Sequence, residues 1–228
     1  MLEPLGPQLW LCDGPAINAL AGFYYPTRMA ILQLDCGSLA VWSPVALPPA
    51  LRAEIDALGP VAHLIAPNHL HHLSLPQWIS AYPNAQVHGA PGLAHKRTDL
   101  DFDSTLGAEA PAAWAGQIDQ VLLHGNKITT EVVFFHRASG TVLFTDFLQH
   151  LPKGWFRGWR AVVARLDLMT GADPAVPRKF RLAQTDRHAA REAVSHMQGW
   201  PVTQIVMAHG APVTQDAPAI LRRAFAWL

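Results

Sequence analysis

The chain has 228 residues, and half of them are hydrophobic, which is enough for one sizeable core or for two halves that share a core. Lysine plus arginine and aspartate plus glutamate both number 17, so the formal net charge is zero. This balance argues against a large basic face. We therefore expect no nucleic-acid partner and no electrostatic attraction of the whole chain to anionic lipid.

The two cysteines, Cys12 and Cys36, show no metal-binding or redox spacing, and we interpret both as small buried side chains in a reducing compartment. The N-terminus Met-Leu-Glu-Pro lacks the basic and apolar regions of a signal peptide. No apolar run approaches the roughly 20 residues of a membrane span. These features predict a cytoplasmic protein without a membrane partner.

The first half of the chain alternates predicted strands with predicted helices, which is typical of the α/β class. Prolines and apolar residues at helical spacing indicate a helix at 48–58, and a second helix is expected from 75 to 82. Asp13-Gly14-Pro15 is expected to end the first strand. The predicted strands are 8–12, 29–34, 39–42, 61–66 and 85–88.

The second half begins with residues 93–117, which show no firm pattern. The two clearest strands of the chain follow, joined by a hairpin-length connection that ends in glycine. A Pro-rich loop is expected at 171–178. The predicted strands are 120–124, 131–135, 141–145 and 204–208, and the predicted helices are about 160–169, 185–198 and 217–228.

Polar residues gather at the ends of predicted strands. The cluster Asn68-His69-Leu70-His71-His72 follows a buried strand, and His136, Asp146 and His209 each end a later strand. Loops at strand ends of an α/β sheet converge on one site, and imidazole and carboxylate are ligands of zinc, iron and manganese. These residues predict a metal site. Taken singly, a strand-end histidine is more often structural, and Asp146 could cap a turn or helix.

The order of these motifs resembles the metallo-β-lactamase superfamily, which carries an HxHxDH loop, a third histidine, a bridging aspartate and a final histidine. Four segments look more specifically like an uncharacterised branch, the DUF4336-type group. The resemblance spans nearly the whole chain and implies one α/β domain, 1–228, a four-layer αββα sandwich with pseudo-halves of about 1–118 and 119–228. The four segments are Trp42–Leu47, Ala66–His72, Phe134–Arg137 and Thr145-Asp146.

The HxHxDH motif itself is absent. In one register His69 and His71 take the first two histidine positions, and no ligand falls on the Asp-His pair. In the other, His71 and His72 take the Asp-His pair, and the first histidine position falls on residues 67–68, which are Pro and Asn. Both registers stay open. The aspartate that helps to hold a second metal in the superfamily is missing or replaced by histidine.

The resemblance implies a metal-dependent hydrolase that uses metal-activated water on an ester, thioester, lactone or phosphoester of a small-molecule substrate. Zinc is the first choice, with iron and manganese as alternatives, as one or two ions. Asp146 and His72 would be the catalytic groups that move the proton. The implied metal ligands are His69, His71, His72, His136, Asp146 and His209.

Two other functions stay open. One is a non-catalytic protein that keeps the fold and a degenerate metal site for binding or structure. The other is a redox enzyme with an iron pair. Such an enzyme usually has a flavin partner, and the chain shows no Gly-rich loop for a nucleotide. The aromatic run 23–25, with Trp155 and Trp159, either lines an apolar pocket or packs in the core. The oligomeric state is open, with a dimer as one option.

Overall fold

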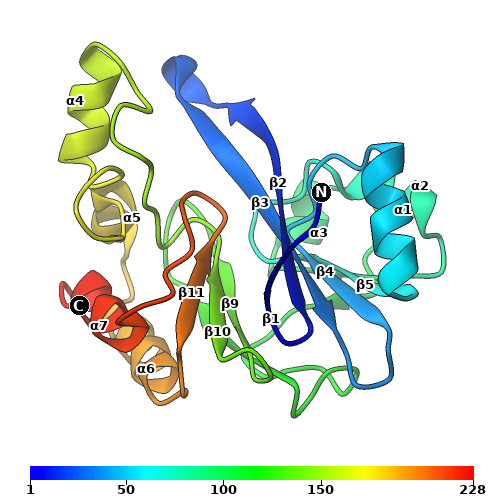
Figure 1. Ribbon diagram of the computed structural model, residues 1–228. Coiled ribbons are helices and arrows are strands. Elements are labelled where there is room, and N and C mark those ends of the chain that lie inside the picture. Colours follow the sequence, from blue (N-terminus) through cyan, green and yellow to red (C-terminus); the bar gives the residue numbers. More distant parts are fainter.

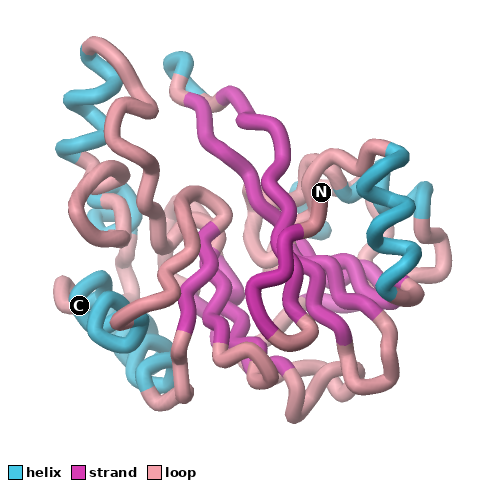
Figure 2. The backbone as a smooth tube through the Cα atoms, in the orientation of Figure 1, coloured by secondary structure: helices cyan, strands magenta, loops and turns pink.

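Two β-sheets face each other at the centre of the computed structural model, which describes all 228 residues (Figure 1). Helices lie on both outer sides, so that the layers run helix, sheet, sheet, helix (Figure 2). The prediction of a four-layer αββα sandwich is confirmed. The helices are α1 (Pro49–Leu58), α2 (Leu75–Ala81), α3 (Leu93–Lys96), α4 (Trp159–Leu166), α5 (Arg178–Ala183), α6 (Arg187–Gln198) and α7 (Ala217–Phe225).

The first sheet has seven strands that neighbour one another in chain order. The pairs from β1 to β4 are antiparallel, and those from β4 to β7 are parallel. The strands are β1 (Glu3–Gly6), β2 (Leu9–Asn18), β3 (Tyr24–Gln33), β4 (Leu39–Trp42), β5 (Val61–Ala66), β6 (Gln86–Gly89) and β7 (Ser104–Thr105).

The second sheet has four strands in the order β11-β10-β9-β8. Strand β10 pairs parallel with β11 and antiparallel with β9, which in turn pairs antiparallel with β8. The site-forming loops leave this sheet where β10 and β11 end together. The strands are β8 (Ile118–Leu123), β9 (Glu131–His136), β10 (Thr141–Phe144) and β11 (Gln204–Met207).

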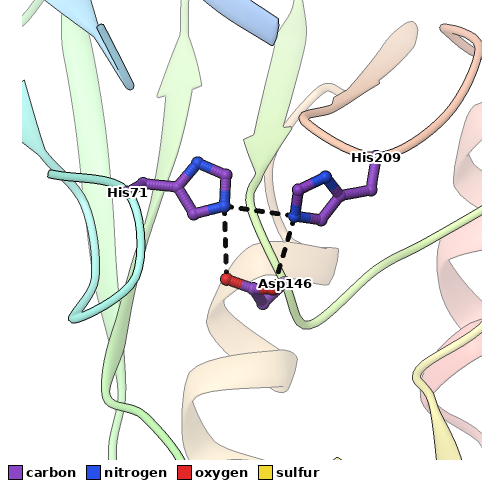
Figure 3. A group of neighbouring side chains, drawn as sticks. All are labelled: His71, Asp146 and His209. Carbon is purple, nitrogen blue, oxygen red and sulfur yellow. Dashed lines mark hydrogen bonds and ion pairs between the residues drawn. The ribbon is translucent and has the colours of Figure 1, made fainter. Parts of the chain in front are cut away.

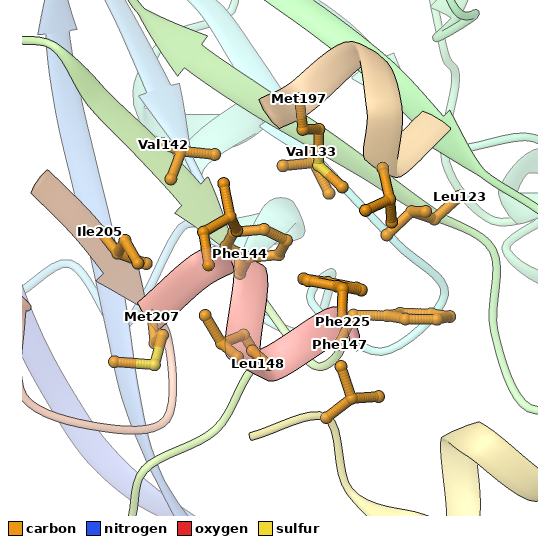
Figure 4. Close-up of a cluster of buried hydrophobic side chains, with 14 of the residues drawn as sticks. Leu123, Val133, Val142, Phe144, Phe147, Leu148, Met197, Ile205, Met207 and Phe225 are labelled. Carbon is orange, nitrogen blue, oxygen red and sulfur yellow. The ribbon is translucent and has the colours of Figure 1, made fainter. Parts of the chain in front are cut away.

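Every residue of β9 and β10 is buried, because both faces of the second sheet are covered. Side chains alternate between the faces along a strand. Val132 and Phe134 thus join the core between the sheets, while Val133 and Phe135 join the core under the outer helices. Figure 4 shows part of that outer core, where Phe225 of α7 packs on the sheet.

The hairpin of β2 and β3 is longer than predicted. Asp13-Gly14-Pro15 does not end the strand, because a register shift between Gly14 and Ile17 absorbs the irregular residues and β2 continues to Asn18. The outer half of this hairpin, residues 13–28, reaches beyond the sheet (Figure 1); we call it the distal hairpin. It reaches the functional site described below.

Strand β1 and helix α5 are among the elements that lie outside the predicted ones, as are α3 and β7 within residues 93–117. Strand β1 is a four-residue edge strand, and α5 starts within the Pro-rich loop, directly after Pro177, whose fixed φ suits a helix start. None of the helices combines the length and the hydropathy that crossing a membrane would require.

Candidate metal centre

Three buried side chains converge from the loops that follow β5, β10 and β11 (Figure 3). The Nε2 atom of His71 lies 3.2 Å from Nε2 of His209 and 3.3 Å from Oδ2 of Asp146. The Nε2 atom of His209 lies 3.4 Å from Oδ1 of Asp146. Two imidazoles and one carboxylate therefore point at a common centre.

Both histidines are fixed from behind in the same tautomer. Nδ1 of His209 lies 2.6 Å from the carbonyl oxygen of Pro26, which can only accept, so Nδ1 carries the proton. Nδ1 of His71 lies 2.8 Å from the hydroxyl of Ser43, whose own proton is donated to the carbonyl of Arg28. Nδ1 of His71 is therefore also the donor. Each Nε2 then turns a lone pair toward the other and toward Asp146.

Three lone-pair-bearing atoms at this spacing repel one another unless a cation lies between them. A tetrahedral zinc site with bonds of about 2.0–2.1 Å has ligand-to-ligand distances of about 3.3–3.4 Å. The three distances of 3.2, 3.3 and 3.4 Å match three edges of such a tetrahedron. The residues present thus fit one divalent ion with one position left open.

The protonation states suit a metal as well. Burial alone would raise the pKa of Asp146, but the adjacent imidazoles of His209 and His71 hold that pKa well below its usual range. Burial lowers the pKa of His71 more than the carboxylate raises it. A metal site needs an ionised carboxylate and neutral imidazoles, and the surroundings favour an ionised Asp146 and a neutral His71.

Asn68 organises the loop that carries His71. Its side-chain oxygen accepts hydrogen bonds from the backbone N–H groups of Leu70 and His71 at 2.8 and 2.9 Å. Its amide nitrogen donates to Oδ2 of Asp146 at 2.6 Å and to the hydroxyl of Thr145 at 2.8 Å. One fully buried side chain thereby holds two of the three converging residues.

Glu131 holds the loop that carries Asp146. Its carboxylate accepts the backbone N–H groups of Thr145, Asp146 and Phe147 at 2.7, 2.8 and 3.0 Å. Burial, together with the negative charge of Asp146, raises the pKa of Glu131 to about 7. The fully buried carboxyl group of Glu131 therefore fixes the position of one backbone turn.

The distal hairpin holds the loop that carries His209. The guanidinium of Arg28 donates to the carbonyl oxygens of Met207 and Gly210, on either side of His209. Asp13 binds the other edge of the same guanidinium through two hydrogen bonds of 2.6 and 3.0 Å. Arg28 is thus oriented before it meets the loop.

The structure does not bring the other three predicted ligands to this group. Nε2 of His69 points to the carbonyl oxygen of Pro91 at 2.5 Å. Nδ1 of His72 accepts from Arg97 at 2.7 Å, and burial, followed by nearby positive charge, lowers the pKa of His72 to about 4. Of the six predicted ligands the structure thus brings together His71, Asp146 and His209, while the ring of His72, a predicted catalytic group, contacts Arg97.

His136 lies at the other end of the second sheet. It pairs with Thr141 at the start of β10, whereas Asp146 follows the end of β10. The six residues of β9 separate His136 from the site by about 16 Å. Its Nδ1 instead lies 2.8 Å from the hydroxyl of Ser139. The site-facing end of β9 carries Glu131.

Sequence reasoning missed the supporting residues. Ser43 follows a predicted strand, 39–42, whose parallel neighbour precedes the histidine cluster. Glu131 starts the predicted strand that pairs with the strand before Asp146. Both positions at strand ends could have been recognised from the sequence. Arg28 and the carbonyl of Pro26 had no local signal, because their role depends on the extended hairpin. A cavity of about 70 Å³, lined in part by Ser43 and His71, lies on one side of the centre.

The profile of DUF4336, a domain of unknown function, matches residues 8–158. Among curated proteins there is no match. The fold is similar to that of the DIM-1 metallo-β-lactamase exposed to ceftazidime, with 14% identity, 100% of this chain and 95% of that chain covered, and a TM-score of 0.66.

Two further solved structures are similar. The metallo-β-lactamase from Pontibacter korlensis has 13% identity, 100% and 97% coverage and a TM-score of 0.64. The metallo-β-lactamase FIM-1 from Pseudomonas aeruginosa, in its mono-zinc form, has 12% identity, 98% and 93% coverage and a TM-score of 0.55. Likeness at such identities shows the fold alone. The predicted resemblance is confirmed: the chain belongs to the DUF4336 family and has the metallo-β-lactamase fold.

Proposed function

We propose that this protein is a metal-dependent hydrolase with one divalent ion held by His71, Asp146 and His209. The observation that carries the proposal is the convergence of three lone-pair-bearing atoms 3.2–3.4 Å apart, with both imidazoles held in the ligating tautomer. Zinc is the first choice, because two imidazoles, one carboxylate and an open position are typical of catalytic zinc. The mono-zinc form of FIM-1 is a precedent within the fold.

A bound divalent ion would supply a Lewis acid and would lower the pKa of a coordinated water from 15.7 toward about 7. The protein's own residues do the remaining work. Asp146 stays ionised and would orient a nucleophilic water by accepting a hydrogen bond from it. Ser43 and the carbonyl of Pro26 keep both imidazoles oriented, so that neither swings away during turnover.

The substrate class follows from the resemblance: a small molecule with an ester, thioester, lactone or phosphoester bond. The cavity beside His71 is narrow and has both polar and apolar walls, with Thr27 and Ser43 near Ile17 and Val45. A reacting group of a few atoms fits there, while the remainder of a substrate would lie outside. The cavity by itself does not favour one of the four bond types.

The direct test is the metal content of purified protein. After growth with zinc, iron and manganese supplied together, elemental analysis is expected to find about one ion per chain, and His71→Ala and His209→Ala are expected to lose it. His69→Gln and His136→Gln are matched controls that should keep it, because neither side chain faces the centre. Metal-free wild type, or equal metal in all four variants, would refute the proposal.

One observation favours a second function, a metal site that binds without catalysis. The side chains of His71, Asp146 and His209 are only 6, 8 and 3% exposed, and closed sites are typical of structural metals. A panel of ester, thioester, lactone and phosphodiester substrates, with and without chelator, separates the two. Chelator-sensitive turnover that is lost in His209→Ala supports the hydrolase. Metal binding that raises thermal stability without turnover of any substrate supports the alternative.

A further inference from the structure

Helix α4 turns its large apolar side chains toward solvent. Trp159, Val162, Val163 and Leu166 recur at the i, i+3, i+4, i+7 spacing that normally forms the buried stripe of a surface helix. Here they are 54, 59, 41 and 59% exposed, and the buried residue of the helix is the small Ala164. Phe23 contacts the ring of Trp159, with 5.7 Å between the ring centroids, but most of the apolar face of the helix is left uncovered in this chain.

The tip of the distal hairpin extends this face. Leu20 is 91% exposed and lines one cavity together with Val163 of α4. Hydrogen bonds hold the tip in place: Arg160 donates to the carbonyl of Ala21 at 2.9 Å, and Trp155 donates to the carbonyl of Tyr24. We call the exposed residues of the two elements the apolar patch: Leu20, Trp159, Val162, Val163 and Leu166.

The cavity within the apolar patch has a volume of about 240 Å³ and is lined mainly by apolar side chains, Phe23 and Met169 among them. That volume lies below the roughly 300–1,000 Å³ of sites for drug-sized ligands. An alkyl chain fits such a space. Lys179 and Asp167 both lie at the cavity wall and pair with each other at 3.3 Å, so the charge inside the cavity is balanced.

Positive charge is concentrated in the segment that carries α4 and α5. Residues 153–183 contain seven of the 17 basic residues and two of the 17 acidic ones, a surplus of five positive charges in a chain of zero net charge. Around α4, Arg160 and Arg165 flank the apolar stripe on its two sides, and Arg157 precedes the helix. An anionic group next to an apolar chain is the complement of this surface.

From the exposed stripe, the cavity and the charge surplus together, we propose that the apolar patch binds a single-chain anionic amphiphile, such as a fatty carboxylate. The alkyl chain lies in the cavity between Leu20 and Val163, and the anionic group lies among the arginines that flank α4. A second copy of the chain fits less well, because a two-fold contact would oppose two positive surfaces. The proposal does not depend on the metal centre.

The test is calorimetric titration of the wild-type protein with dodecanoate below its micelle concentration. Saturable binding is expected, and dodecyltrimethylammonium, with the same chain and the opposite charge, should bind much more weakly. Val163→Asp should weaken dodecanoate binding about ten-fold, since it removes about 1.5 kcal/mol of apolar contact. Arg165→Gln should weaken it about two- to five-fold, the range for an exposed ion pair.

Two control variants complete the design. Arg222→Gln on α7 makes the same change of charge as Arg165→Gln, and Ile128→Asp makes a similar change at an exposed apolar residue outside the patch. Both should bind dodecanoate like the wild type, and metal content should be unchanged in all four variants. Absence of dodecanoate binding, equal binding of the cationic amphiphile, or no effect of Val163→Asp would overturn the proposal.

Two other occupants of the patch, a second copy of the chain and a lipid bilayer, would give different experimental results. A dimer in sedimentation that Val162→Asp dissociates would assign the surface to a second copy of the chain. Co-sedimentation with anionic vesicles, without binding of monomeric dodecanoate, would assign it to a lipid bilayer. Either result overturns the proposal of a single bound amphiphile.

Discussion

Asn68 offers the sharpest test of how the candidate metal centre is held. The substitution Asn68→Ala removes four hydrogen bonds: those to the backbone of Leu70 and His71, and those to Thr145 and Asp146. Each is worth about 1 kcal/mol net, and partners left unpaired in a buried site cost more. We expect a loss of about 3–4 kcal/mol in the free energy of unfolding, measured by urea denaturation of the metal-free protein.

A measurement of metal affinity shows whether Asn68 supports the metal site or only the stability of the fold. Loss of a residue that orients metal ligands typically lowers metal affinity 10–100-fold. We expect Asn68→Ala to show such a loss in competition with a chelating dye, because both His71 and Asp146 lose their support.

The matched control is Thr145→Val. It removes only one hydroxyl partner of Asn68 and leaves the 2.6 Å bond from Asn68 to Asp146 in place. Its metal affinity should stay within about three-fold of the wild type. If Asn68→Ala is destabilised yet binds metal as tightly as Thr145→Val does, Asn68 is a structural residue only and the reasoning fails.

Three further predictions concern other parts of the chain. Arg28→Gln should weaken metal binding about ten-fold in the same dye assay, because the His209 loop loses its guanidinium clamp, while Arg28→Lys should restore part of the affinity. Burial lowers the pKa of His136 to about 4, below its unfolded value near 6.5, so the neutral ring stabilises the fold fully above pH 6.5 and this stability is lost as pH falls toward 4. Between pH 7.5 and 5 the loss is about 2 kcal/mol in the free energy of unfolding, and His136→Gln should remove that part of the pH dependence in urea titrations. Gly59→Ala should lower the midpoint of thermal unfolding by an amount corresponding to about 2 kcal/mol, because φ is +154° there and a Cβ would collide with the carbonyl oxygen of Gly37; an unchanged midpoint would contradict the strain.

The sequence was sufficient for the part of the site that depends on parallel strand order. His71, Asp146 and His209 follow β5, β10 and β11, and β10 and β11 are parallel neighbours whose ends coincide. Loops at such ends must meet, whatever their detailed conformation. The α/β class followed from the alternation of strands and helices, and the four-layer arrangement followed from the resemblance to the metallo-β-lactamase superfamily.

His136 shows why a strand end alone is not enough. Residues 131–145 were predicted as a hairpin, and in a hairpin the residue before the turn lies at the opposite end from the residue that follows the second strand. His136 precedes the turn and Asp146 follows the return strand, so they cannot meet. The same geometry places Glu131 at the end of β9 next to the loop after β10, where its carboxylate accepts the backbone N–H groups of residues 145–147.

The histidine cluster could not be resolved by pattern, because a loop has no fixed period. Which histidine points inward depends on the turn that Asn68 makes with the backbone of Leu70 and His71. With that turn, His71 points to the centre, His69 contacts the carbonyl oxygen of Pro91, and His72 contacts Arg97. A long-range contact, Asn68 to Asp146, fixes the result, and no local window contains both residues.

The distal hairpin links the two surfaces for which we propose functions. Its residues 26 and 28 hold the loop of His209, and its tip forms one wall of the cavity in the apolar patch. Tyr25 contacts both regions. Its ring centroid lies 5.3 Å from that of His209, and its side chain also lines the cavity, where its hydroxyl accepts a hydrogen bond from Lys179 at 3.2 Å. The extension of β2 and β3 past residue 12, which local sequence did not predict, therefore positions a proposed metal ligand and builds a cavity wall with the same few residues.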